Sequence, residues 1–309
     1  MPAQAQQTER EREQQFTYYW YAARQAKENG QYDRALMLLL QCEQLNPDDA
    51  LTKETIGLLY YGTGRRRQAQ EYIAKAFNLD PGERWQTYYN LLDLLPPNDD
   101  QGKAEQQLNV LERAAEANPK NPEIYENMVS LYSGFKNWKR AFECLDKIEE
   151  LRGKDPRCAL VRYRLYRYLN KDKKALKAVE DYLKVDPANP ELLKLQIVLL
   201  SEHKASVKKL RPLYDRLLTL TPNDPSVLNN YAWMLAENKT DLNFAETLVL
   251  RALNADSENP IFIDTYAWIL YQKGKRDMAR YFIRQAMQLT SPSSPAMKEI
   301  QKHYKIIYK

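Results

Sequence analysis

The side chains that most often carry chemistry are scarce in this chain and lack catalytic or metal-binding spacing. The three cysteines, Cys42, Cys144 and Cys158, form no C-x-x-C pair, and only His203 and His303 could add imidazole ligands. Phosphate-binding and dinucleotide-binding glycine motifs, the H-E-x-x-H zinc helix and the G-x-S-x-G nucleophile motif are also missing. We therefore expect no enzymatic activity, no metal and no cofactor.

One charged segment has a composition suited to binding anions. From Arg157 to Lys184 the chain alternates arginine and lysine with tyrosine. This pattern fits a solvated helix face with inward tyrosines, a surface for an anionic peptide or protein, or a surface for nucleic acid. The net charge of +5 from 46 basic and 41 acidic residues does not by itself indicate nucleic acid, because long helical faces carry such an excess without an anionic partner.

The helices expected to carry these side chains recur at intervals of about 34 residues. In residues 50–83, apolar or small side chains recur at helical intervals in two successive segments, and Pro81 closes the unit. These side chains are Ile56, Gly57, Tyr60, Ala69, Ile73 and Ala76. The pattern predicts two amphipathic helices whose small residues allow close packing, so the unit is a helix-turn-helix.

Counting in both directions from this unit places eight copies and two flanking segments. Twelve of the sixteen prolines fall at the junctions between copies, where a helix must stop. Residues 1–15 are expected to be a disordered or fraying tail, or to extend the first helix outward, and residues 294–309 are expected to form a capping helix. The copies are 16–49, 50–83, 84–121, 122–155, 156–189, 190–224, 225–259 and 260–293.

Two copies depart from the pattern. In the third, Pro96 and Pro97 should end the first helix, and a longer loop is expected over residues 98–102. In the sixth, the first helix is apolar nearly all round, and Pro212 predicts a kink or a late start of the second helix.

These copies resemble the tetratricopeptide repeat (TPR) over residues 16–309. The resemblance implies an all-α, right-handed α-solenoid of about eight repeats with a capping helix. It also implies a non-catalytic scaffold that binds a peptide or partner protein in the concave groove lined by the first helices. One alternative is a regulatory subunit of a separately encoded enzyme. The other is a nucleic-acid-binding repeat protein, which the small positive net charge favours less.

Numbering the positions within each repeat, which we call the repeat frame, also predicts a candidate groove. Large aromatic and polar side chains fall at the positions of the first helices that face the concave side, and such residues often dominate interface energies. They are Trp20, Tyr21, Arg24, Trp85, Tyr88, Tyr89, Asn127, Arg164, Trp233 and Trp268. The carboxylate clamp of chaperone-adaptor TPR proteins is matched only at Asn127 and Arg157, whereas Tyr88, Leu92 and Val161 stand at three of its other positions.

The compartment is left open by the sequence. Ala3, Gln4 and Ala5 form an A-x-A pattern like the remnant of a trimmed secretory signal, which would place the protein in the periplasm or cell envelope. The last two repeats, with the sequence segments NNYAWMLA and IDTYAWILY, look most like those of bacterial TPR proteins, several groups of which work in the envelope. An ordinary polar tail would leave a cytoplasmic protein. In an oxidising compartment Cys144 and Cys158 could form a disulfide, although we expect thiols.

Overall fold

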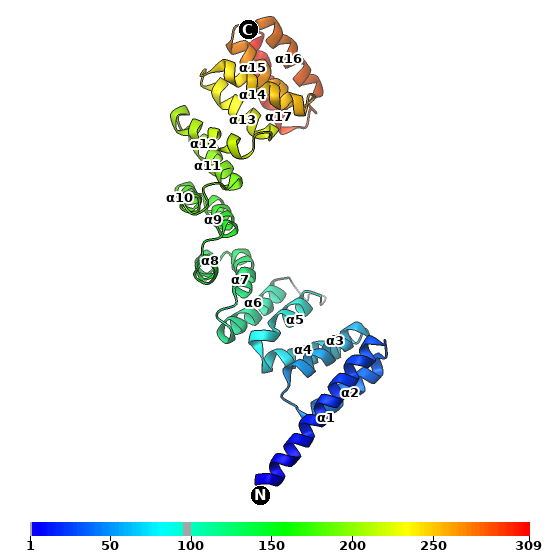
Figure 1. Ribbon diagram of the computed structural model, residues 1–309. Helices are drawn as coiled ribbons and strands as arrows, with labels where there is room; N and C mark the ends of the chain where they lie inside the picture. Colours follow the sequence, from blue (N-terminus) through cyan, green and yellow to red (C-terminus); the bar gives the residue numbers. More distant parts are fainter. Residues whose placement is uncertain (1, 95–99) are drawn as a thin grey trace. The chain divides into compact units, whose positions relative to one another are not determined.

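The computed structural model describes residues 2–94 and 100–309. Within these residues the chain forms seventeen α-helices and no strand, and successive helices pair through short turns (Figure 1). The all-α helical-repeat architecture predicted from the spacing is confirmed. The chain divides into two compact units, Met1–Gly153 and Lys154–Lys309, called the N-terminal and C-terminal units below.

The N-terminal unit consists of four helix pairs. Its helices are α1 (Pro2–Glu28), α2 (Tyr32–Leu45), α3 (Ala50–Gly62), α4 (Arg66–Leu79), α5 (Pro81–Leu94), α6 (Asp100–Ala117), α7 (Pro122–Gly134) and α8 (Trp138–Arg152).

The C-terminal unit consists of four further pairs and a last single helix. Its helices are α9 (Pro156–Tyr168), α10 (Asp172–Leu183), α11 (Pro190–Glu202), α12 (Val207–Leu220), α13 (Pro225–Glu237), α14 (Leu242–Ala255), α15 (Pro260–Gln272), α16 (Arg276–Leu289) and α17 (Pro295–Ile307).

Junction prolines start helices as well as stopping them. Besides α1 and α5, which also begin with a proline, six helices have a proline at the first helical position, where its missing N–H removes no helical hydrogen bond. The residue before each of these six prolines is Asn, Asp or Ser, and its side chain accepts a hydrogen bond from a backbone N–H of the first turn. This Asn/Asp/Ser-Pro pair fixes where each first helix begins: α7, α9, α11, α13, α15 and α17.

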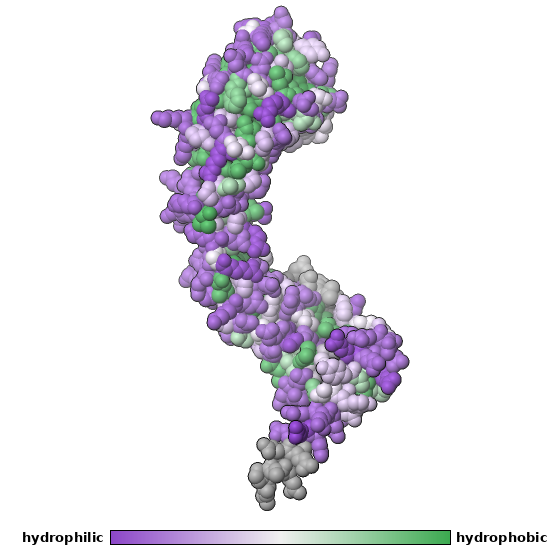
Figure 2. Space-filling view, viewed as in Figure 1, coloured by the Kyte–Doolittle hydropathy of each residue, from purple (hydrophilic) through white to green (hydrophobic). Residues whose placement is uncertain are grey.

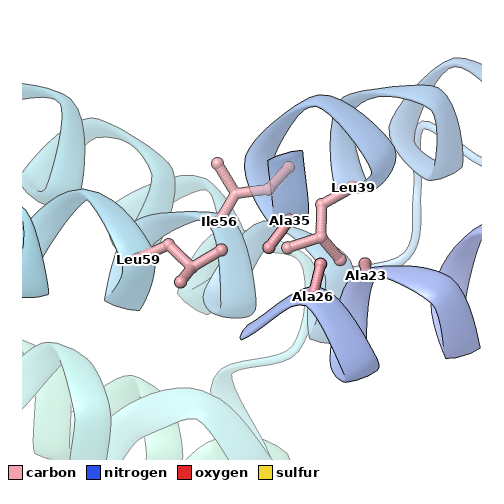
Figure 3. Close-up of a cluster of buried hydrophobic side chains, with 6 residues drawn as sticks. All are labelled: Ala23, Ala26, Ala35, Leu39, Ile56 and Leu59. Atoms are coloured by element: carbon pink, nitrogen blue, oxygen red, sulfur yellow. The ribbon is translucent and has the colours of Figure 1, made fainter. Parts of the chain in front are cut away.

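Small residues bring the two helices of a pair close together. Ala35, Ala23 and Ala26 are buried in a cluster with larger aliphatic side chains from α2 and α3 (Figure 3). At Gly57, a side chain could not be added without a shift, because its Cβ would lie 2.5 Å from Cγ1 of Ile73. Burial of these residues excludes water from the interior of each pair and supplies the hydrophobic stabilisation of the stack.

Three segments test the sequence-based expectations. Helix α1 begins at Pro2, so of the alternatives for the N-terminal segment the outward extension of the first helix is the one observed, with residues 8–15 exposed (Figure 2). Helix α6 begins at Asp100, so residues 100–102 of the predicted 98–102 loop are helical, and residues 98–99 lie outside the described residues. Helix α12 begins at Val207 and continues through Pro212, so the late start is wrong. Packing of buried Leu210 and Tyr214 on either side of the proline stabilises this turn of helix.

The cysteines are buried within helices, and none forms a disulfide. Burial raises the pKa of the Cys42 and Cys144 thiols to about 11, so only about one molecule in a thousand carries the thiolate at pH 8. We expect both thiols of the folded protein to react with iodoacetamide at least tenfold more slowly than in urea, measured by mass spectrometry of timed samples. Equal rates in the folded and unfolded states would show that these thiols are accessible.

Candidate functional site

The first helices of the C-terminal unit form an inner row. Helix α9 lies against α11, α13 against α15, and α15 against α17, whereas among the described helices of this unit no Cα atom of one second helix lies within 8 Å of a Cα atom of another. Helices α11 and α13 break this row, because each packs on the second helix α12 while no Cα atom of α11 lies within 8 Å of a Cα atom of α13. The row therefore has one gap, and α12 lies beneath it.

A pocket of about 460 Å³ occupies this gap, a volume within the range of ligand-binding clefts. Its floor is apolar, because Ile197, Tyr214, Leu217 and Val227 are buried there. Its rim is mostly polar and consists of exposed and half-buried residues, and it includes Val198, which is 45% exposed. The other rim residues are Lys194, Ser201, Glu202, Asp224, Ser226 and Asn230. Such a pocket can take an apolar side chain and offer hydrogen bonds to the chain that carries it.

A fixed ion pair crosses the rim. Nζ of Lys194 lies 3.2 Å from a carboxylate oxygen of both Glu191 and Asp224. Burial alone would raise the pKa of Asp224, but hydrogen bonds from the Val227 N–H and from Lys194 outweigh it and hold this pKa below its usual value. Asp224 therefore stays ionised while it caps α13, and it links α11 to α13 across the mouth of the pocket.

A buried polar cluster joins α17 to the inner row. Nδ1 of His303 lies 2.9 Å from both carboxylate oxygens of Asp264 in α15, and both side chains are buried. The imidazole stacks on Trp268, with ring centroids 4.7 Å apart, and lies 5.1 Å from the ring of Trp233. Because α17 supplies His303, this cluster anchors the capping helix.

The N-terminal members of the predicted groove lie in different environments. Tyr21 and Arg24 are exposed, and Trp20 is half-buried with its ring stacked on Phe16 at 6.2 Å. In α5, the side chain of Trp85 is 4% exposed, so its ring packs in the core instead of lining an open surface. The neighbouring Tyr88 and Tyr89 are half-buried against Phe77 and Trp85, at centroid distances of 5.2 and 6.2 Å.

The remaining four predicted residues also divide between surface and core. Arg164 is exposed, and Trp233 is half-buried. Trp268 is 8% exposed and packs in the His303 cluster. The side-chain amide of Asn127 donates a hydrogen bond to the carbonyl of Glu123 in its own helix, 2.8 Å away. Trp85 and Trp268 therefore do not line an open surface, and whether the exposed members of the set bind a partner stays a prediction.

The pocket itself was missed by the sequence analysis. Lys194, Val198 and Asn230 occupy the same concave positions of their repeats that were used to choose the ten groove residues. Lys194 and Val198 were not chosen because the sixth repeat is degenerate and Val198 is neither aromatic nor charged. Applying the repeat frame to this repeat as strictly as to the others would have found Lys194 and Val198.

Neither a membrane span nor a metal site emerges from the geometry of residues 2–94 and 100–309. No helix there is both long enough and apolar enough to cross a bilayer. No group of three or more His, Cys, Asp or Glu side chains in this part of the chain could hold a metal ion.

Stacked helix pairs with a closely packed inner row define the α-solenoid class of repeat proteins. Family models described as tetratricopeptide repeat match residues 84–292 and residues 53–83. The chain therefore belongs to the tetratricopeptide repeat family, which is generally a non-catalytic protein-interaction fold. No match to a curated protein sequence was found.

Solved structures of similar fold are also TPR proteins. One is the C-terminal part of a TPR repeat-containing protein from Cytophaga hutchinsonii, at 17% identity and a TM-score of 0.57, covering 80% of this chain and 98% of that one. Another is YrrB, described as a TPR protein with an unusual peptide-binding site, at 20% identity and a TM-score of 0.50, covering 62% of this chain and 97% of that one. At these identities the likeness concerns the fold alone.

Proposed function

We propose that this protein is a non-catalytic scaffold that holds an extended segment of a partner protein along its inner row of first helices. In the C-terminal unit, one apolar side chain of that segment enters the pocket between α11 and α13. The observation that carries the proposal is the gap in the inner row, because it combines an apolar floor with a mostly polar, partly exposed rim. The peptide-binding description of YrrB is consistent with this use of the fold.

The rim has the groups that an extended peptide requires. An extended peptide presents unpaired backbone N–H and C=O groups, and the exposed amide of Asn230 can both donate to and accept from them. The floor residues exclude water from an apolar anchor, which is the arrangement found at the strongest points of protein interfaces. In the N-terminal unit, the exposed Tyr21 and Arg24 are proposed as partner contacts of that unit by itself.

Charge placed at the rim should weaken binding without unfolding the protein. The test uses peptides selected on the wild-type protein from a random display library. We expect Val198→Lys to weaken their binding at least tenfold, because an ammonium group would have to be desolvated in the anchored complex. Fluorescence anisotropy with labelled peptides measures this change.

Val185→Lys is the matched control, because Val185 is 60% exposed and lies between α10 and α11, outside the pocket. It should change affinity by less than twofold, and both variants should keep the wild-type melting temperature. If the two variants bind equally well, or if no library peptide binds at micromolar concentration, the proposed pocket function is wrong. If the purified protein instead captures one enzyme in stoichiometric amount from a native extract, that result favours a role as a regulatory subunit.

A further inference from the structure

Formal charge is distributed very unevenly along the chain. Residues 1–153 contain 19 basic and 24 acidic side chains, whereas residues 154–309 contain 27 basic and 17 acidic ones. The repeat at 156–189 alone has nine basic and four acidic residues, an excess equal to the net charge of the whole protein. The segment from Arg157 to Lys184, for which the sequence allows three interpretations, is therefore the main source of the positive charge.

Much of this excess gathers at one end of two successive repeats. Three lysines lie at the start of α10, and three more lie in the turn from α11 into α12, and all six are exposed. The two groups are neighbours, because Nε2 of His203 at the end of α11 lies 3.0 Å from Asp172 at the start of α10. We call this surface the basic end, and it comprises Lys171, Lys173, Lys174, Lys204, Lys208 and Lys209.

The carboxylates at this end are already engaged by other groups. Arg167 lies 3.1 Å from Asp172 and 2.7 Å from Glu202, and His203 contacts Asp172 as well. Within the described part of the chain, none of the six lysines has a carboxylate within ion-pair distance. Some lysines elsewhere in the described chain are paired, as are Lys53 with Glu43 and Lys273 with Glu246. The basic end therefore keeps its charge available to another molecule.

These lysines do not stabilise the helices that carry them. Lys173 and Lys174 lie in the first turn of α10, and Lys208 and Lys209 lie in the first turn of α12. The N-terminal end of a helix is the positive end of its dipole, so cations are unfavourable there. The folded chain alone gains no stability from this placement.

We propose that the basic end binds an acidic segment of a partner protein. The carboxylates of Asp172 and Glu202 lie among the lysines and would repel a nucleic acid, which carries a phosphate at every nucleotide. An acidic polypeptide can place neutral residues beside these carboxylates and its Asp or Glu side chains beside the lysines. This surface extends beyond the pocket of the proposed function, and its binding does not depend on that pocket.

A charge-neutralising variant tests the proposal on the full chain. The probe is a fluorescent peptide of twelve residues that alternates Glu with Ser, compared with a twelve-nucleotide single-stranded DNA. We expect Lys171→Gln, Lys173→Gln and Lys174→Gln together to weaken peptide binding at least tenfold at low salt. The melting temperature should be unchanged or raised, because these cations oppose the dipole of α10.

The matched control removes the same charge from α17 and the residues after it. Lys298→Gln, Lys305→Gln and Lys309→Gln together neutralise three exposed lysines of the same unit and should weaken peptide binding less than twofold. Equal losses in the two triple variants would mean that only net charge attracts the peptide, which overturns the assignment. Tighter binding of the DNA than of the peptide, or no peptide binding at 20 °C in about 20 mM salt, would overturn it as well.

Discussion

Replacing Asp264 by alanine is expected to lower the free energy of unfolding by about 1–3 kcal/mol, the cost of leaving a buried imidazole without its hydrogen-bond partner. Asp264 and His303 are 6% and 2% exposed, and Nδ1 of the imidazole is 2.9 Å from both carboxylate oxygens. Without the carboxylate, a buried N–H of His303 would lose its acceptor while the ring stays stacked on Trp268. Urea unfolding followed by tryptophan fluorescence measures the loss.

Two further variants separate this effect from a general disturbance of α17. Glu299→Ala removes a half-exposed carboxylate that lies 3.6 Å from Nε2 of the same histidine, and it should cost less than about 1 kcal/mol. Asp264→Leu combined with His303→Leu removes both polar partners and should cost less than Asp264→Ala alone. If Asp264→Ala and Glu299→Ala have equal effects, the buried pair does not hold the capping helix in place.

Replacing Gly57 by leucine is the second change expected to have a large effect, with a loss of about 1–3 kcal/mol in the free energy of unfolding through overpacking. A Cβ at this position would lie 2.5 Å from Cγ1 of Ile73, 3.1 Å from its backbone nitrogen and 3.2 Å from the carbonyl oxygen of Ala69. The last two atoms belong to the backbone of α4 and cannot turn away, so α3 and α4 would have to separate.

Gly62 provides the control within the same helix. Nothing lies within 4 Å of a Cβ built at Gly62, and leucine is a better helix former than glycine by about 1 kcal/mol. Gly62→Leu should therefore leave the midpoint of urea unfolding unchanged or raise it slightly. A destabilisation as large as that of Gly57→Leu would contradict close packing at Gly57 as the cause.

The repeated architecture was readable from sequence because it depends on local spacing. Gly57 and Ile73 belong to one repeat. The contact between this small and this large residue is expected because a short turn joins the two helices that carry them. Prolines after Asn or Asp mark the helix starts for the same reason, since a cap and a fixed φ act within one turn. These signals do not need information about distant residues.

Contacts between repeats were less predictable. The pairing of Asp264 with His303 joins residues 39 positions apart, and no spacing rule selects this aspartate among the others on the inner row. Likewise, Trp268 looks like an interface residue in a single repeat, but the next first helix covers it. The pocket depends on the separation between the backbones of α11 and α13, which the pattern of one helix cannot reveal.

The most direct test of the scaffold proposal is a photo-cross-linking map with a library-selected peptide. A benzophenone side chain replaces the apolar anchor of the peptide, and cross-linked residues are identified by mass spectrometry. The account expects adducts at the rim and floor of the pocket, at Val198, Val227 or Asn230, and their loss in Val198→Lys but not in Val185→Lys. Adducts confined to the second helices, or unchanged by Val198→Lys, would contradict it.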